Sequence, residues 1–194
     1  MDFPKKHLES LWAPWRVEYY EAELADGHDF FDAAAQSPDD AAHLVVARGK
    51  SVFLMMNKYP YTAGHLMVVP YRKVRSMEEL AENEALELWS FCILAQRILT
   101  KVVRAQGFNV GVNLGPVSGA GFAEHMHFHV VPRWSGDSNF MATIADTRIL
   151  PQALEPLYRK LREVADENGA RAFLPVYEGK GTDWKVRSPV FTSA

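Results

Sequence analysis

The sequence predicts an α+β domain built on a mainly antiparallel five-stranded sheet with two helices. Two observations indicate this fold. Short apolar runs follow one another with hairpin-like connections, and two longer segments show helical spacing. The resulting order of three strands, a helix, two strands and a helix favours an antiparallel sheet over a parallel one. At 194 residues, the chain has the size of one domain.

The first three strands are predicted at residues 44–47, 51–57 and 65–69. The first two are separated by Arg48-Gly49-Lys50, which is typical of a hairpin. Pro70 ends the third run, because proline donates no hydrogen bond to a neighbouring strand. This part of the chain therefore predicts an antiparallel meander.

Two further strands are predicted in the second half of the chain. From Phe108 to Leu114, apolar residues alternate with small or polar ones, so the apolar side chains would share one face. A glycine-rich loop, residues 115–121, follows. The last strand is predicted from His125 to Val131 and ends before Pro132.

Two helices complete the predicted fold. Ser76 to Glu79 matches a capping box, which predicts a helix over residues 77–104 with one apolar stripe. Gly107 would terminate it. Residues 152–168 show the same spacing, and Pro156 is tolerated only because it lies near the start of that segment.

Composition and charge exclude several classes of protein. Apolar residues make up 48% of the chain and charged residues 23%, which excludes a disordered or fibrous chain. The formal net charge of −3 gives no basic footprint for a general nucleic-acid binder. The single cysteine, Cys92, excludes an internal disulfide and fits a reducing compartment. No secretory signal or transmembrane segment is recognised in the sequence.

Three histidines at alternate positions, His125, His127 and His129, form the most informative pattern. On a strand they would project to one side, about 6.6–6.8 Å apart, while Met126 and Phe128 face the core. Each imidazole carries polar nitrogens that need hydrogen-bond partners, so burying a row of three in an apolar core is unfavourable. Three interpretations remain open: a polar sheet face, a metal site that uses two of the rings, and nucleophilic catalysis at phosphorus.

Residues 125–131 reproduce the histidine-triad motif, His-φ-His-φ-His-φ-φ, in which φ is apolar. Residues 57–70 resemble the upstream signature of the same family, Asn…Pro…Gly-His…Pro, and Asn113-Leu114-Gly115 also matches its pattern. The chain therefore resembles the histidine triad (HIT) superfamily of nucleotide hydrolases and transferases. The core similarity covers residues 44–134.

The flanks of this core narrow the branch. Residues 11–16 and 132–141 resemble bacterial members related to diadenosine tetraphosphate phosphorylases. The expected organisation is an N-terminal aromatic arm and loop at residues 1–43, a HIT domain at 44–168 and a C-terminal tail at 169–194. Within the arm, residues 22–42 would form a loop or short helices.

The resemblance implies a role for each matching histidine. His127 would be the nucleophile that attacks the α-phosphorus of a nucleotide and forms a nucleotidyl-histidine intermediate. His129 would contact phosphate oxygens and assist the leaving group. His125 would orient His127, largely through its backbone carbonyl, and His65 would pack behind the triad as a fourth histidine.

The resemblance also implies residues that bind the nucleotide. Asn57 occupies the position that holds the ribose hydroxyls, and Asn113 matches a residue near the phosphate. Gly119 and Gly121 lie in a loop that could offer backbone N–H groups to phosphate. Three arginines are candidates to reach the distal phosphates, although each could also be only a surface charge. They are Arg16, Arg72 and Arg133.

The sequence departs from the family at two positions. Many relatives carry Gln, Ser or Thr three or four residues before the first triad histidine, where this chain has Phe122 and Gly121. The usual side-chain contact to phosphate is therefore missing. The cysteine pairs of zinc-bearing relatives are also absent, so no metal and no cofactor is expected.

The leading hypothesis is an enzyme that cleaves diadenosine polyphosphates at the α-phosphate, by hydrolysis or phosphorolysis. A nucleotide-binding regulator with little turnover is the first alternative, and a metal-dependent enzyme is the second. The expected partners are a nucleotide and a second copy of the chain, with no nucleic acid and no membrane. The expected location is cytoplasmic.

Overall fold

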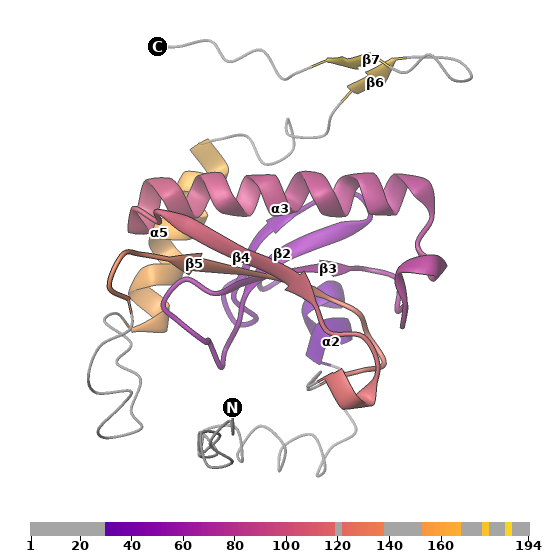
Figure 1. The fold of residues 1–194 in the computed structure, drawn as a ribbon, viewed down its shortest axis with the longest axis horizontal. Helices are drawn as coiled ribbons and strands as arrows, with labels where there is room; N and C mark the ends of the chain where they lie inside the picture. The colour runs from indigo at the N-terminus through magenta and orange to yellow at the C-terminus, as the bar shows by residue number, and fades with distance from the viewer. Residues whose placement is uncertain (1–29, 119–121, 138–152, 168–175, 179–184, 188–194) are drawn as a thin grey trace, which may run out of the picture.

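The computed structural model describes residues 30–118, 122–137, 153–167, 176–178 and 185–187. Five strands in this part of the chain form one antiparallel sheet in the order β1-β2-β3-β5-β4 (Figure 1). Their bounds are β1 (Val45–Arg48), β2 (Val52–Met56), β3 (Leu66–Pro70), β4 (Gly107–Val112) and β5 (Phe128–Arg133). The predicted α+β class and its five-stranded sheet are confirmed.

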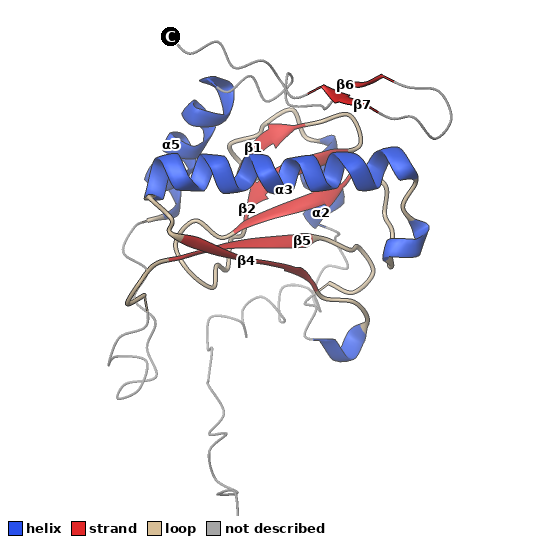
Figure 2. Cartoon of the chain, turned by 45° about the horizontal axis from the view of Figure 1, so that its top comes forward, coloured by secondary structure: helices blue, strands red, loops and turns tan. Residues whose placement is uncertain are grey.

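Helices cover both faces of this sheet (Figures 1 and 2). One face packs against α3 (Glu82–Val103) and α5 (Leu154–Glu167), and the other packs against α2 (Phe30–Gln36). Alternation along the strands separates the two cores, so that Leu54 belongs to the α3 side and Phe53 to the α2 side. The described residues thus contain a third helix, α2, beyond the two that the fold prediction counted, within the segment 22–42 that was predicted to form a loop or short helices.

The start of the long helix differs from the prediction. Ser76 precedes only a short 3₁₀ turn, Met77–Glu79, and α3 begins at Glu82. The Glu84 carboxylate, at the third position of α3, accepts a hydrogen bond from the Ala81 backbone N–H at 2.8 Å. The reciprocal half of a capping box is impossible, because alanine has no side-chain acceptor.

The turn between β1 and β2 is attached to α3 through a buried carboxylate. Both oxygens of Glu87 accept backbone hydrogen bonds at 2.7 Å, one from Lys50 and one from Ser51. Glu87 is only 5% exposed. Because these N–H groups would otherwise lack partners at the end of the hairpin, Glu87 fixes the position of the turn.

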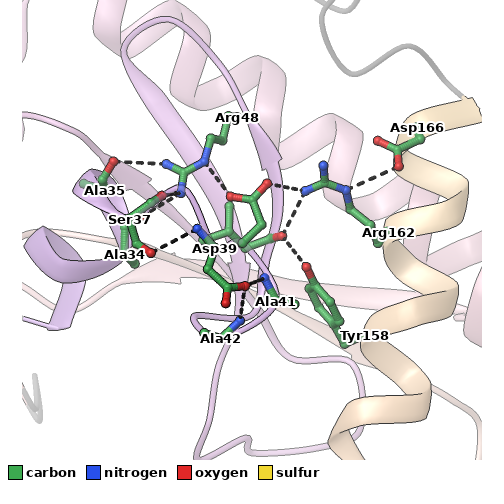
Figure 3. Close-up of polar contacts among 12 residues, drawn as sticks. Ala34, Ala35, Ser37, Asp39, Ala41, Ala42, Arg48, Tyr158, Arg162 and Asp166 are labelled. Atoms are coloured by element: carbon green, nitrogen blue, oxygen red, sulfur yellow. Dashed lines mark hydrogen bonds and ion pairs between the residues drawn. The ribbon is translucent and has the colours of Figure 1, made fainter.

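Arg48 contacts the C-terminal end of α2 (Figure 3). Arg48 Nη2 donates to the carbonyls of Ala34 at 2.7 Å and Ser37 at 2.9 Å, at the C-terminal end of the helix. The last carbonyls of a helix have no partner within it, so Arg48 supplies one. Asp40 joins this arginine to Arg162 of α5, with N–O distances of 2.7 and 2.6 Å. We call Asp40, Arg48 and Arg162 the arginine clamp.

The two ends of the chain fall largely outside the described residues. Residues 1–29 of the predicted arm are not described, so that assignment remains a prediction. In the predicted tail, β6 (Val176–Glu178) pairs antiparallel with β7 (Lys185–Arg187). No helix in the described ranges is long and apolar enough to cross a membrane.

Candidate active site

The sequence predicted that all three histidines lie on a strand, but only His129 does. Strand β5 begins at Phe128, where it pairs with Val68 of β3, so His125 and His127 precede the strand. The chain departs from the sheet there because the Met126 N–H donates to the Val74 carbonyl at 2.7 Å. Met126 and Phe128 still point into the core beneath α3, as predicted.

His127 has its ring orientation set by a carbonyl. Its Nδ1 lies 2.9 Å from the backbone oxygen of His125. A carbonyl can only accept, so Nδ1 carries the proton and Nε2 of the neutral ring carries the lone pair. The His127 residue is only 7% exposed.

His129 carries its ring proton on the other nitrogen, Nε2. Its Nδ1 lies 3.0 Å from Nε2 of the fully buried His65. The backbone N–H of Tyr61 donates to His65 Nδ1 at 3.1 Å, so that nitrogen is unprotonated. His65 therefore carries its proton on Nε2 and donates it to His129 Nδ1, which leaves the proton of a neutral His129 on Nε2.

The predicted ribose contact, Asn57, also lies against the fourth histidine. Its Oδ1 accepts from the Tyr59 N–H at 2.8 Å, which identifies the other amide atom as nitrogen. That Nδ2 lies 3.3 Å from His65 Nδ1. The loop between β2 and β3 thus directs two donors, the Tyr61 N–H and the Asn57 amide, at the same ring nitrogen.

The first histidine of the triad connects the site to β3. Nε2 of His125 lies 2.8 Å from the Pro70 carbonyl, so this nitrogen is protonated and donates. Phe31 of α2 packs against both neighbouring rings, with centroid distances of 5.2 Å to His125 and 4.7 Å to His127. The nucleophile candidate therefore rests on a helix whose end the arginine clamp holds.

Aromatic residues form one wall of the site, and two of them, Phe30 and Phe31, were not predicted from the sequence. Phe122 lies 6.1 Å from Phe30 and 6.2 Å from Phe31, in edge-to-face geometry. The Lys73 ammonium sits 5.0 Å from the centroid of the Phe122 ring. The adjacent pair Phe30-Phe31 was the available signal, but the surrounding Ala- and Asp-rich segment has no helical periodicity.

Of the remaining predicted residues, one lies beside the triad and others lie outside the described residues. β4 pairs with β5 so that Gly111 is opposite His129 and Val112 opposite Phe128, which places Asn113 at the end of the strand beside the triad. Gly119 and Gly121 lie outside the described residues, as does Arg16.

The other two predicted cations are paired with carboxylates. Arg72 donates to both oxygens of Glu84 at 3.0 and 2.6 Å. Arg133 binds Asp137 and Asn109, and its hydrogen bond lowers the pKa of Asp137 to about 2. Neither pair contains a residue of the triad.

The metal interpretation finds no support among the described residues. They contain no group of three or more His, Cys, Asp or Glu side chains arranged to hold an ion. Two of the ring nitrogens are already committed, because Nε2 of His125 and Nδ1 of His127 each donate to a carbonyl. The arrangement instead combines one basic ring nitrogen with a neighbouring N–H donor.

Comparison with known proteins identifies the class to which this fold and site belong. The family model of the HIT domain matches residues 39–136, about the region that the motifs indicated. The chain belongs to the HIT family. This finding confirms the predicted family.

One curated relative extends over most of the chain. The AP-4-A phosphorylase of Mycobacterium tuberculosis is 43% identical over 164 residues, which is 81% of this chain and 84% of the relative. The asymmetrical bis(5'-nucleosyl)-tetraphosphatase of Schizosaccharomyces pombe is 30% identical over 93 residues, 48% of this chain and 50% of that protein.

Solved structures agree on the fold. A zinc-bound histidine triad protein from Mycobacterium smegmatis aligns with a TM-score of 0.55 at 21% identity, covering 73% of this chain and 96% of that one. An ADP-glucose phosphorylase from Arabidopsis thaliana aligns with a TM-score of 0.57 at 17% identity, covering 76% of this chain and 46% of that one.

Proposed function

We propose that this protein is an enzyme that cleaves diadenosine polyphosphates at the α-phosphate through a nucleotidyl intermediate on His127. The observation that carries the proposal is the pair of adjacent rings with opposite protonation: a lone pair on His127 Nε2 and an N–H on His129 Nε2. The 43% identity to an AP-4-A phosphorylase supports the substrate class.

In the first step, the lone pair of His127 Nε2 attacks the α-phosphorus. The P–N bond forms as the bond from phosphorus to the bridging oxygen breaks, and the electron pair leaves on that oxygen. His127 becomes positively charged because it keeps its proton on Nδ1. The His125 carbonyl, 2.9 Å from Nδ1, stabilises this charge.

In the second step, an oxygen nucleophile attacks the same phosphorus and the P–N bond breaks. The attacking water or hydrogen phosphate gives up its proton to solvent, so that water releases AMP and inorganic phosphate releases ADP. The relative named a phosphorylase favours phosphate as the acceptor. The electrons of the P–N bond return to Nε2, which restores the starting tautomer of His127.

Other residues would bind the substrate around the triad. Asn113, beside the triad at the end of β4, would contact phosphate, and Asn57 would contact the ribose through the amide hydrogen that His65 does not engage. Gly119 and Gly121 would offer backbone N–H groups to the phosphates. His129 would donate its Nε2–H to the oxygens that gain charge.

Product analysis of diadenosine tetraphosphate, with and without inorganic phosphate, tests this function. ADP plus ATP formed only with phosphate would identify a phosphorylase, and AMP plus ATP under both conditions would identify an asymmetric hydrolase. His127→Ala should abolish either reaction while the melting temperature stays close to that of the wild type. Full activity in His127→Ala would refute the proposal.

A second candidate is a nucleotide-binding regulator with little turnover. Phe122 favours it, because a phenyl ring occupies a position where many relatives carry a phosphate-binding side chain. The ring contacts Phe30 and Phe31 instead. This candidate predicts tight nucleotide binding with negligible cleavage of every dinucleotide, so rapid turnover in the same product analysis excludes it.

We also propose that the protein forms a homodimer through α3 and β4. Trp89 of α3 is 61% exposed and Ile93 is 39% exposed, while Val110 of β4 is 39% exposed. A groove of about 430 Å³ lies between Ile93 and Phe108. β4 is an edge strand of the described sheet, and an exposed apolar edge is suited to pairing with a second chain.

Sedimentation equilibrium tests the dimer. The wild type should sediment at twice the mass of one chain, and Trp89→Glu should shift it to the monomer. A monomeric wild type would contradict the proposal. The control Lys50→Glu also changes one exposed residue, at the opposite edge of the sheet, and should leave the dimer intact.

We propose a cytoplasmic location for the protein. Its one cysteine, Cys92, has no partner for an internal disulfide, which suits a reducing compartment. Burial raises the pKa of the Cys92 thiol to about 12, so the side chain is unreactive.

A further inference from the structure

The protonation of His129 is determined by a chain of contacts that starts at the backbone of the β2–β3 loop. The Tyr61 N–H donates to His65 Nδ1 at 3.1 Å, and a backbone amide cannot act as an acceptor. His65 must then hold its proton on Nε2, 3.0 Å from His129 Nδ1. One backbone N–H thus fixes the tautomers of two histidines.

Two further contacts reinforce this arrangement. The Asn57 amide, oriented by the Tyr59 N–H, directs Nδ2 at His65 Nδ1 from 3.3 Å. The Tyr61 ring stacks on the His65 ring, with centroids 4.7 Å apart and an angle of 27° between the planes. His65 is fully buried, so water does not offer its ring alternative partners.

This arrangement opposes a second proton on His129. An imidazolium ring would carry a proton on Nδ1, where His65 already directs its own N–H. His65 could accept that proton only by moving its own to Nδ1, toward the two donors Tyr61 N–H and Asn57 Nδ2. Both hydrogen bonds would be replaced by contacts between donors, which is costly in a buried site.

We propose that Asn57 and Tyr61 are positioning residues that keep His129 neutral and thereby restrict the enzyme to leaving groups that depart as stable anions. The proposal rests on the function proposed above. As His127 attacks, the electron pair of the breaking bond goes to the leaving oxygen, and His129 donates a hydrogen bond without transferring its proton. A polyphosphate leaving group suits this step, because its oxygen is weakly basic. A basic alkoxide or amine leaving group would need a proton that neutral imidazole does not give.

A series of aryl esters of AMP tests this inference, because all members share the adenylyl group and differ only in the leaving phenol. Release of the phenol in a single turnover reports the first chemical step. The wild type should cleave the 4-nitrophenyl ester at least about 100-fold faster than the phenyl ester, the lower range of what proton transfer contributes. Equal rates for the two esters would show that His129 acts as an acid and would overturn the proposal.

Asn57→Asp should change this selectivity. The carboxylate keeps the acceptor for the Tyr59 N–H but directs an oxygen at His65 Nδ1, which stabilises a proton there. His65 Nε2 can then accept from a protonated His129, and the ratio between the two esters should fall about tenfold or more toward unity. An unchanged ratio in a folded Asn57→Asp would contradict the proposed role of Asn57.

Asn57→Ala is the matched control at the same position. It removes the amide contact to His65 and any contact to ribose, but it adds no acceptor, and the Tyr61 N–H still holds the His65 tautomer. Both esters should be cleaved more slowly, and the ratio between them should fall less than in Asn57→Asp, because one of the two donors at His65 Nδ1 remains. A loss of sugar binding is therefore distinguished from a change in the protonation of His129.

Long-range ¹⁵N–¹H correlation spectra of the histidine-labelled wild type give an answer that does not depend on activity. His65 and His129 should show protons on Nε2, and His127 should show its proton on Nδ1. Protonation of His129 on Nδ1 would overturn the proposal even if every substrate is cleaved. If no nucleotide is cleaved but the tautomers are as stated, the proposed function fails and the positioning chain stands.

Discussion

His127 and His129 lie two residues apart and carry their protons on opposite ring nitrogens. Their ring centroids are 4.8 Å apart and their planes are nearly perpendicular, at 75°. The His125 carbonyl fixes the proton of His127 on Nδ1, and the Nε2–H of His65 fixes the proton of His129 on Nε2. The same short segment therefore presents a basic ring nitrogen beside a hydrogen-bond donor, and two different parts of the fold set these two protonation states.

Replacing each ring should separate the two roles. His127→Ala should lower the rate by at least about 1,000-fold and form no covalent adduct, because the attacking nitrogen is gone. His129→Ala should still form the adduct, with a rate lowered by about 10²–10³-fold through loss of one charge-stabilising donor. Rapid quenching followed by mass spectrometry of the intact protein detects the added adenylyl group.

The presence or absence of the adenylyl adduct in the two variants shows which histidine is the nucleophile. An adduct that accumulates only in the wild type and in His129→Ala supports the assignment of His127 as nucleophile. An adduct in His127→Ala would reverse it. Melting temperatures of both variants provide the control for folding.

Phe31 links helix α2 to His127, the proposed nucleophile, which predicts an effect on activity beyond stability. Phe31→Ala should destabilise the protein by about 3–5 kcal/mol, because a fully buried phenyl ring is lost. It should also lower kcat in the fraction that remains folded, since the ring at 4.7 Å no longer supports His127. Urea denaturation and steady-state kinetics measure the two effects.

Phe91→Ala is the matched control for Phe31→Ala. Phe91 belongs to α3, is 1% exposed and packs between this helix and the sheet, on the opposite face of the sheet from the triad. A similar loss of stability with normal kcat is expected. If the two variants have equal kcat, Phe31 has no role beyond the core.

Strong local signals in the sequence predicted the sheet and the histidine motif. The predicted strand at residues 65–69 differs from β3 (Leu66–Pro70) by one residue at each end, because an apolar run and a proline are local signals. The predicted start of α3 was wrong. Glu84, rather than Glu79, accepts a backbone N–H at the start of the helix, from Ala81, and its carboxylate also pairs with Arg72 from outside the helix.

The parts of the site that were missed depend on contacts between distant segments. Helix α2 lies in an Ala- and Asp-rich stretch without periodicity, and its C-terminal carbonyls are satisfied by Arg48 from β1. The protons on His65 and His129 depend on a backbone N–H in a loop. A motif identifies which residues are present, but it does not identify the partners that set their tautomers.

The arginine clamp predicts how stability depends on pH. Partial burial acts to raise the pKa of Asp40, but the hydrogen bonds from Arg162 and Arg48 outweigh it and hold that pKa below the ordinary value of 3.8. A carboxyl with a lowered pKa in the folded state stabilises the protein above its unfolded pKa. This contribution is therefore full near neutral pH and is lost as the pH falls below about 4 and through the lowered pKa.

Asp40→Asn should be less stable than the wild type by about 1–2 kcal/mol at pH 7, and the difference should shrink toward pH 2. Urea denaturation at several pH values measures it. Asp166→Asn removes the more exposed partner of Arg162 and should change stability by less than about 0.5 kcal/mol. A difference for Asp40→Asn that is constant with pH would contradict the assigned charge effect.

Gly49 tests whether the β1–β2 turn depends on its contact with α3. A Cβ at Gly49 would lie 2.3 Å from Glu87 Oε1 and 2.9 Å from the Phe91 ring, both closer than real contacts allow. Glu87 cannot move away without losing the hydrogen bonds that it accepts from the backbone N–H groups of Lys50 and Ser51. Gly49→Ala should therefore lower the free energy of unfolding by about 1–3 kcal/mol in urea denaturation.

Gly107→Ala provides the comparison that isolates crowding from the change of residue type. The nearest atom to a Cβ at Gly107 is Arg133 Cβ at 3.9 Å, an ordinary contact, so this variant should be close to the wild type in stability. If Gly49→Ala is as stable as Gly107→Ala, the turn is able to shift and Glu87 does not fix it. If only Gly49→Ala is destabilised, the hairpin and α3 form one packed unit, joined through the Glu87 carboxylate.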